Sequence, residues 1–239
     1  MDQEPGLLAL LSFGPDGWGD ELLLGLRVTL MLAIMTAPIG LVGGFLLALA
    51  RRSENPFLKG PATVFTTVFK GLPELITLFI VYYGLSLAIA WLFSLFGDVR
   101  VEVSSFLAGM LALGAVSASF ASEVFMGALG GIQRGQVEAA EALGLKPWAR
   151  MRTVLIPQVM RLALPGLGNL WLVLLKDTAL VSVIALPDLL RRTQIAVGAT
   201  KEPFFFYMVA IGIYFVISMI SMGAFALLEQ RYSRGYAAR

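Results

Sequence analysis

Four long runs of this sequence contain no charged residue, and they restrict the possible folds more than any other feature. They cover residues 28–50, 75–97, 103–122 and 203–228, each at least 20 residues long. A helix rises about 1.5 Å per residue, so about 20 residues cross a hydrocarbon core roughly 30 Å thick. With 58% hydrophobic residues, 14% charged residues and a mean hydropathy of +0.81, the chain is predicted to be an integral membrane protein.

A fifth span is predicted over about residues 163–186, although Lys176 and Asp177 lie near its middle. Without this span, the two loops beside it would fall on sides of the membrane that their charges disfavour. The expected fold is therefore all-α and polytopic with five transmembrane helices, which puts the two termini on opposite faces.

Positive charges predict the orientation, because Lys and Arg concentrate in cytoplasmic loops. The first 21 residues hold five acidic residues and no basic one, so the N-terminus is expected outside. The basic residues near Arg191 weaken this bias without reversing it. The connections expected inside carry Arg51, Arg52 and Lys59, then Arg134, Lys146, Arg150, Arg152 and Arg161, then Arg231, Arg234 and Arg239.

These boundaries define the expected organisation. An outer tail covers residues 1–21, one membrane domain covers 22–228 with a cytoplasmic loop at about 131–161, and an inner tail covers 229–239. The first hydrophobic run is too long and its flanks are too acidic for a cleaved signal peptide, so we expect it to be retained.

Two residue types are missing altogether. The chain has no cysteine and no histidine, which excludes disulfides and thiolate metal sites and removes the commonest general base and metal ligand. No catalytic residue and no metal site is therefore expected. The dipeptide Gly-Lys is also absent, so the chain lacks the usual phosphate-binding loop. A net charge of +2 follows from the inner loops and indicates no nucleic-acid partner.

The loop between the third and fourth spans is predicted to form two short helices. Residues 136–143 are nearly all good helix formers, Gly144 suits a left-handed helix end, and Pro147 suits the first turn of a second helix ending at about Ile156. The first helix has an apolar surface of mostly small side chains and an acidic edge, so we expect it to dock into a groove of a soluble partner. The apolar surface consists of Ala139, Ala140 and Leu143, and the edge of Glu138 and Glu141.

The segment Glu138-Ala139-Ala140 with Gly144 and the later Ile156-Pro157 resembles the EAA loop of the permease subunits of bacterial ABC importers. The resemblance covers about residues 22–234 and is closest to the histidine-, arginine- and octopine-type subunits of the polar amino acid family. It extends through Lys70-Gly71-Leu72-Pro73-Glu74-Leu75, Tyr82-Tyr83-Gly84, Leu164-Pro165-Gly166-Leu167-Gly168-Asn169, Leu175-Lys176-Asp177-Thr178-Ala179-Leu180-Val181-Ser182 and Leu228-Glu229-Gln230-Arg231-Tyr232-Ser233.

This resemblance implies a type I ABC importer transmembrane domain in a bacterial inner membrane. It implies a second permease subunit, with a heterodimer favoured over a homodimer, two copies of an ATPase subunit and a periplasmic substrate-binding protein. No cofactor is expected in this chain, because ATP and Mg would be bound by the ATPase. The substrate would be a polar amino acid or opine, with a basic one favoured. The residues expected to couple ATP hydrolysis to transport are Gly135, Glu138, Ala139, Ala140 and Gly144.

Five charged residues lie in or beside the spans, where an ionisable group normally faces a cavity or a partner. Lys70 and Glu74 are four apart, so they either form a salt bridge or leave Glu74 free for a cationic substrate. Glu123 either pairs with Lys70 or Lys176, or lines the path. Lys176 and Asp177 point about 100° apart on a helix, so they cannot share one partner. All five are candidates for the substrate path.

Several alternatives stay open. An ion-gradient-driven transporter or channel would also be polytopic, although five spans without a visible repeat argue against it. An intramembrane hydrolase would need a serine, Ser117, Ser119 or Ser182, acting with Lys176.

Two further patterns predict local structure. Gly40 with Gly44 and Gly127 with Gly131 predict close helix contacts, and Gly71, Pro73 and Pro165 predict kinks or helix ends.

Overall fold

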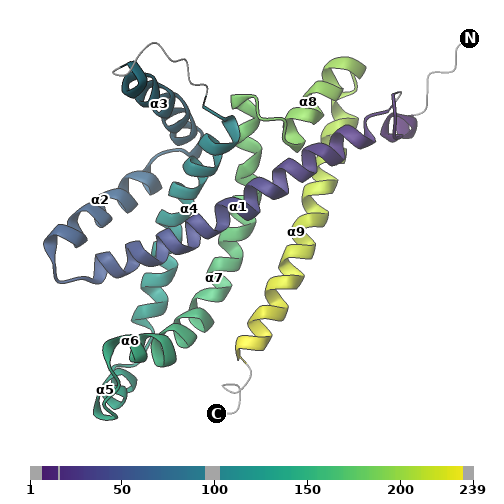
Figure 1. Ribbon diagram of the computed structural model, residues 1–239. Helices are drawn as coiled ribbons and strands as arrows, with labels where there is room; N and C mark the ends of the chain where they lie inside the picture. The colour runs from purple at the N-terminus through teal and green to yellow at the C-terminus, as the bar shows by residue number, and fades with distance from the viewer. Residues whose placement is uncertain (1–6, 16, 95–102, 234–239) are drawn as a thin grey trace, which may run out of the picture. The chain divides into compact units, whose positions relative to one another are not determined.

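The computed structural model describes residues 7–15, 17–94 and 103–233, and every regular element within these ranges is a helix (Figure 1). Parts of both predicted tails and the loop containing Arg100 lie outside the described residues. Five helices in the described ranges are long and apolar enough to cross a membrane, which confirms the predicted number. They are Gly19–Arg52, Glu74–Leu92, Ser105–Gly130, Pro147–Ile184 and Pro203–Tyr232.

The chain order of the elements follows from these spans and the helices between them. The elements are η1 (Leu7–Leu11), α1 (Gly19–Arg52), α2 (Pro56–Gly71), α3 (Glu74–Ser94), α4 (Ser105–Gly130), α5 (Arg134–Ala142), α6 (Pro147–Arg150), the π-helical turn η2 (Met151–Leu155), α7 (Ile156–Asp177), η3 (Thr178–Ile184), α8 (Leu189–Thr200) and α9 (Pro203–Ser233).

Two helices, α2 and α8, occupy segments for which the hydrophobic runs predicted no helix, and each begins at a side-chain cap. The Asn55 side chain accepts a hydrogen bond from the backbone N–H of Phe57 at 2.9 Å, just where Pro56 starts α2. The Asp188 side chain accepts one from the backbone N–H of Arg191 at 2.9 Å at the start of α8. Such caps satisfy backbone donors that lack a partner within the helix.

Of three prolines expected at helix breaks or ends, one lies between two helices and two lie inside a helix. The predicted break near Gly71 and Pro73 is present, because α2 ends there and α3 begins one residue later. The predicted stop at Ile156 is wrong, because the helix continues from α6 through η2 into α7. The wider π-helical turn ends two residues before Pro157 and accommodates a residue that lacks a backbone donor. Pro165 lies inside α7 and ends no helix.

Contacts divide the chain into two compact units, each built from three separate segments. The first unit comprises the described parts of 1–37, 73–114 and 174–218. One of its apolar cores surrounds Leu32, Leu78 and Val181. Another contains Phe206, whose ring meets Trp18 edge to face at 6.4 Å.

The second unit comprises the described parts of 38–72, 115–173 and 219–239. Its core surrounds Ala48, Phe125 and Val159.

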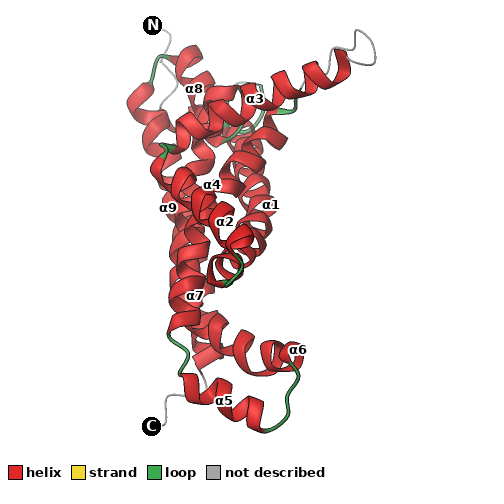
Figure 2. Cartoon of the chain, turned by 90° about the vertical axis from the view of Figure 1, so that its left-hand side faces the viewer, coloured by secondary structure: helices red, strands yellow, loops and turns green. Residues whose placement is uncertain are grey.

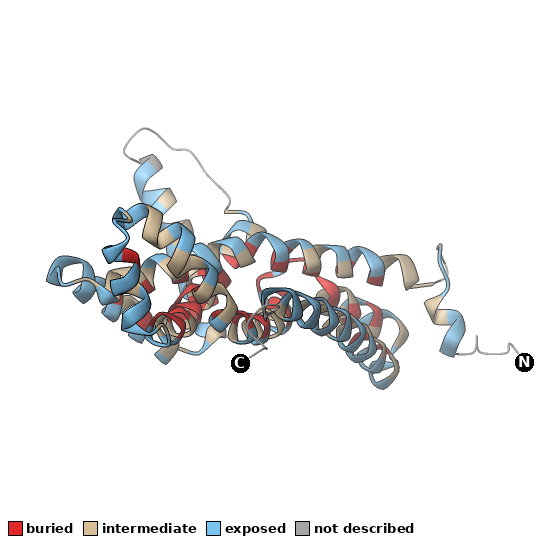
Figure 3. Ribbon diagram, turned by 90° about the horizontal axis from the view of Figure 1, so that it is seen from below, coloured by how far each residue is buried: buried red, intermediate tan, exposed pale blue. Residues whose placement is uncertain are grey.

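Exposed and buried residues alternate along the helices of the chain (Figure 3). Large apolar side chains are exposed on α9, among them Phe215 and Ile220, as expected for a helix that faces lipid or another subunit.

Small residues of α1 and α4 form a close seam within the second unit. A Cβ atom on Gly44 would lie 2.5 Å from the Cβ of Ala121, and one on Gly40 would lie 2.8 Å from the Cβ of Ser117. The predicted close contact is therefore present at this first glycine pair. In the other pair, a Cβ on Gly131 would lie 3.3 Å from Cδ1 of Leu162, whereas one on Gly127 would meet no described atom within 4 Å.

Candidate functional site

The first part of the site is a helical elbow, which consists of α5, the link 143–146 and α6 (Figure 2). The backbone N–H of Leu145 donates to the carbonyl of Ala140 at 3.1 Å, and that of Gly144 donates to the carbonyl of Glu141 at 2.8 Å. Gly144 has a φ of +73°. This is a Schellman helix end, which needs a left-handed residue at the position of Gly144. The predicted glycine stop is confirmed.

The second helix of the elbow begins at Pro147, as predicted. Proline suits a first helical position because its fixed φ is already helical and no partner is needed for an N–H there. Arg150, at the end of α6, forms an ion pair with Glu141 on α5. The pair connects the two helices across the link.

The predicted coupling residues differ in exposure. Gly135, Glu138, Ala139 and Gly144 are exposed, but Ala140 is only 3% exposed. Ala140 therefore packs inside the chain and cannot belong to the outward apolar surface that the sequence predicted for it.

That outward surface is provided by larger side chains. Leu143 is 81% exposed and Trp148 is 72% exposed. Leu143 belongs to the apolar surface that the sequence predicts, whereas Trp148 does not. The available signal was an aromatic residue directly after the proline that begins the second helix.

The second part of the site is a cluster of charges in the second unit. Glu123 of α4 forms an ion pair with Lys70 at the end of α2, and its Oε1 lies 3.1 Å from Nη1 of Arg51 at the end of α1. The same Arg51 nitrogen donates a hydrogen bond to Ser122 Oγ at 3.1 Å. One carboxylate thus links the ends of two helices to α4.

Within this cluster Glu123 pairs with Lys70, one of the two partners that the sequence suggests for it. Lys70 and Glu74 do not share a helix, because α2 ends at Gly71 and α3 begins at Glu74. Although they are four residues apart, Lys70 and Glu74 therefore do not lie on one helical face.

The other three predicted charges belong to the first unit and are arranged differently. Glu74 begins α3, while Lys176 and Asp177 end α7. Asp177 lies close enough to both Glu74 and Lys176 to interact with their charges. Within residues 7–15, 17–94 and 103–233, no salt bridge joins any of these three to another residue. They form a group with two negative charges and one positive charge.

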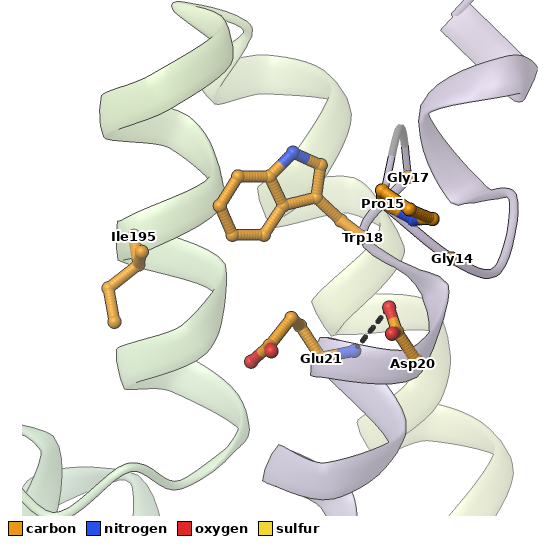
Figure 4. Close-up of a pocket in the computed structure, with 7 residues that line it drawn as sticks. All are labelled: Gly14, Pro15, Gly17, Trp18, Asp20, Glu21 and Ile195. Atoms are coloured by element: carbon orange, nitrogen blue, oxygen red, sulfur yellow. Dashed lines mark hydrogen bonds between the residues drawn. The ribbon is translucent and has the colours of Figure 1, made fainter.

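A pocket of about 670 Å³ in the first unit lies at the start of α1, and no predicted site residue lines it (Figure 4). Its carboxylates already have partners. Asp20 accepts a hydrogen bond from the backbone N–H of Glu21 at 3.0 Å, and Glu21 forms an ion pair with Arg192 of α8. Of the two carboxylates, only Glu21 is paired with a cation, and Asp20 has a single hydrogen bond to a neutral backbone group.

Comparisons with known proteins agree with this arrangement. Residues 40–234 match the family described as the inner membrane component of binding-protein-dependent transport systems. An octopine transport system permease protein of Rhizobium meliloti is 42% identical over 96% of this chain and 98% of its own length. A histidine/lysine/arginine/ornithine transport system permease protein of Escherichia coli (strain K12) is 36% identical over 92% of this chain and 96% of its own length.

Solved structures support the same fold. A chain of an amino acid ABC transporter crystallised with histidines has a TM-score of 0.76 and 32% identity, covering 90% of this chain and 95% of that one. A chain of an inward-facing methionine ABC transporter has a TM-score of 0.72 at 18% identity, covering 90% and 97%, and supports the fold alone. This protein therefore belongs to the family of inner membrane components of binding-protein-dependent transport systems.

Proposed function

We propose that this chain is the permease subunit of an importer that moves a basic amino acid or an opine into the cytoplasm, driven by ATP hydrolysis on a partner chain. The helical elbow carries this proposal. It is a compact, capped element that presents an exposed tryptophan and leucine beside the ends of two spans. These two apolar side chains on one structured loop offer a surface that a partner protein can cover.

The orientation that the proposal requires follows from charge. The elbow and the segments beside it carry the largest group of basic residues in the chain, so we place them in the cytoplasm. This puts the N-terminus in the periplasm, the C-terminus in the cytoplasm, and the elbow where it can meet a soluble ATPase.

The coupling roles proposed for Gly135, Glu138, Ala139 and Gly144 agree with their exposure on the elbow. Ala140 has a different role in this proposal. Its buried methyl group and its carbonyl, which accepts the Leu145 N–H, stabilise the end of α5 from inside.

The charge group of the first unit supports a basic substrate. A basic amino acid carries two positive groups and one carboxylate, while Glu74, Asp177 and Lys176 carry two carboxylates and one ammonium. The two sets are complementary, and complementary charge favours selection of the right ligand. Several similar permeases are named for ligands of this class, including octopine and lysine.

The proposal includes the partners that such a permease needs. They are a second, different permease subunit, two ATPase subunits that hold ATP and Mg, and a periplasmic binding protein that makes the first selection of substrate. An ion-gradient-driven transporter is not favoured, because the chain belongs to a family defined by binding-protein-dependent transport.

Substitution of Gly144 tests the coupling role. Gly144→Val places a β-branched residue at a φ of +73°, which is strongly disfavoured, and destroys the end of α5. Complexes reconstituted with their partner subunits should lose at least about tenfold in ATPase activity stimulated by binding protein, which corresponds to about 1.4 kcal/mol of coupling. Insertion of the chain in the membrane should be unchanged.

The matched control is Gly198→Val in α8. An added Cβ meets nothing within 4 Å at either glycine, but only Gly144 has a positive φ. Normal stimulated hydrolysis and normal uptake by Gly144→Val would overturn the proposed function. Uptake of labelled arginine, histidine, lysine, octopine and glutamine by the wild-type complex then identifies the substrate, and preference for neutral glutamine would overturn the basic class.

A further inference from the structure

The ion pair between Glu141 and Arg150 is the one salt bridge of the elbow within the part of the chain that the structure describes. Its two residues lie nine positions apart, on the last turn of α5 and at the end of α6. No other described side-chain hydrogen bond spans the link 143–146 from α5 to α6. The contact is therefore placed to control the angle between the two helices.

The backbone of the elbow is fixed at each helix end and less constrained between them. The Schellman hydrogen bonds end at Leu145, and α6 begins at Pro147. Lys146 joins them in an extended conformation with a φ of −60° and a ψ of 152°. Rotation about the bonds of Leu145 and Lys146 would swing α6 relative to α5, unless a contact beyond the link opposes it.

The angle matters because the two exposed apolar residues lie on either side of Leu145 and Lys146, about whose bonds α6 would swing. Leu143 is the C-cap residue of α5, and Trp148 is the second residue of α6. Tryptophan is one of the residues that most often dominate a protein interface, and such anchors act in well-packed pockets. Two anchors on different helices enter two pockets of one partner only when the angle between the helices is correct.

We propose that Glu141 and Arg150 are positioning residues, which hold α5 and α6 so that Leu143 and Trp148 engage the ATPase partner together. This inference rests on the proposed function, because the partner that receives the elbow is the ATPase subunit. The Glu141 side chain is 56% exposed and the Arg150 side chain is 20% exposed, so the pair contributes little to overall stability. Its effect is on the angle between α5 and α6.

Charge reversal and charge exchange test the pair. The variants are Glu141→Arg, Arg150→Glu and the double exchange, each assembled with the partner subunits in proteoliposomes. The measurements are ATPase subunit retained on purification, hydrolysis stimulated by binding protein, and substrate transported per ATP hydrolysed. Each single variant should retain the ATPase but transport about 2- to 5-fold less substrate per ATP, the range expected for one exposed ion pair. The double exchange should restore the ratio.

Arg152→Glu is the matched control. Arg152 is exposed, lies two residues beyond Arg150 and has no salt bridge among the described residues. This variant changes the same charge nearby and should keep the wild-type ratio. An ordinary structural role would lower expression without changing substrate transported per ATP, so the ratio separates positioning from folding.

Three results would overturn the inference. They are single variants with a wild-type ratio, a double exchange as impaired as the single variants, and complete loss of the ATPase from the single variants. Failure of the proposed function looks different. In that case Gly144→Val would transport normally, whatever the ion pair does.

Discussion

Glu123 in the second unit contacts two cations, whereas Glu74 in the first unit has no salt bridge to any described residue. Both are carboxylates in helices that are long and apolar enough to span a membrane. Their sequence surroundings did not distinguish them, and both were candidates for the substrate path. The structure separates them by their partners.

The difference indicates what each charge is for. A charge removed from water is costly unless it is paired. Glu123 is compensated by Lys70 and Arg51, so its role can be completed within this chain. Glu74 and Asp177 bring two like charges close together with one lysine, an arrangement that a cationic ligand would compensate. The comparison favours Glu74, Asp177 and Lys176 over Lys70 and Glu123 as substrate contacts.

Removing the paired carboxylate should have the largest effect on stability. Glu123→Gln leaves Lys70 and Arg51 as neighbouring cations without an anion. Breaking a fully buried pair costs about 3 to 5 kcal/mol. Because the Glu123 side chain is 41% exposed, we expect a loss of about 2 to 3 kcal/mol after screening by water. Chemical unfolding in detergent measures it.

The control for this comparison is Glu229→Gln, an acid-to-amide change in the same unit at a residue with no salt bridge among the described residues. It should leave stability nearly unchanged. If Glu123→Gln unfolded like this control and yet abolished uptake, Glu123 would return to the substrate path and the comparison would fail.

Asp188 extends the comparison to a carboxylate whose contribution to stability depends on pH. It is fully buried and lies outside the spans. Burial raises its pKa from 3.8 to about 6, against hydrogen bonds from the backbone N–H groups of Arg191 and Leu190, which lower it. The folded state therefore binds the proton more tightly than the unfolded state. The contribution of Asp188 to stability falls as pH rises from about 4 through about 6.

Asp188→Asn removes this dependence and keeps an acceptor for the helix cap. Between pH 4 and a pH above 6, the stability of the variant relative to wild type should rise by about 2 kcal/mol. A shift of one pKa unit corresponds to about 1.4 kcal/mol, and because pH 4 lies slightly above the unfolded pKa of 3.8, part of the total is already lost there. The weaker cap of the amide lowers the stability of the variant equally at every pH and leaves this difference unchanged. Unfolding measured between pH 4 and 8 checks this, with Asp188→Ala as the variant that loses the cap at every pH. Parallel curves for wild type and Asp188→Asn would contradict it.

Neutralising the unpaired carboxylate should change transport rather than stability. Glu74→Gln removes one negative charge from the first-unit group, so the KM for a basic amino acid should rise about tenfold, or about 1.4 kcal/mol. Unfolding should match the wild type. Glu202→Gln, at an exposed acid without a salt bridge among the described residues, is the matched control. Unchanged uptake by Glu74→Gln would remove it from the substrate path.

The parts of this fold that depend on local chemistry could be predicted from the sequence. Uncharged runs predict the five spans because the bilayer requires about 20 apolar residues for each. Gly144 and Pro147 predict the elbow because each favours one backbone conformation. Asn55 before Pro56 and Asp188 before α8 are also helix-start signals, but the helices that follow them are shorter than the apolar runs that mark the spans.

Long-range contacts could not be predicted in the same way. Arg51 and Glu123 lie far apart in the sequence, and no spacing rule connects them, so this half of the cluster was missed. The continuous helix through Pro157 was also missed, because a π-helical turn leaves no simple sequence pattern. Burial of Ala140 depends on packing around the elbow, which composition does not reveal.

The glycine seam of α1 has a consequence for motion within the second unit. A Cβ at Gly43 would lie 3.1 Å from the Cβ of Ala118, so three glycines of α1 fit against three small residues of α4. Sliding α1 by one helical turn would bring the bulkier Leu47 to the place of Gly43. The two helix segments are consequently held in one register, and this register keeps Arg51 within reach of Glu123.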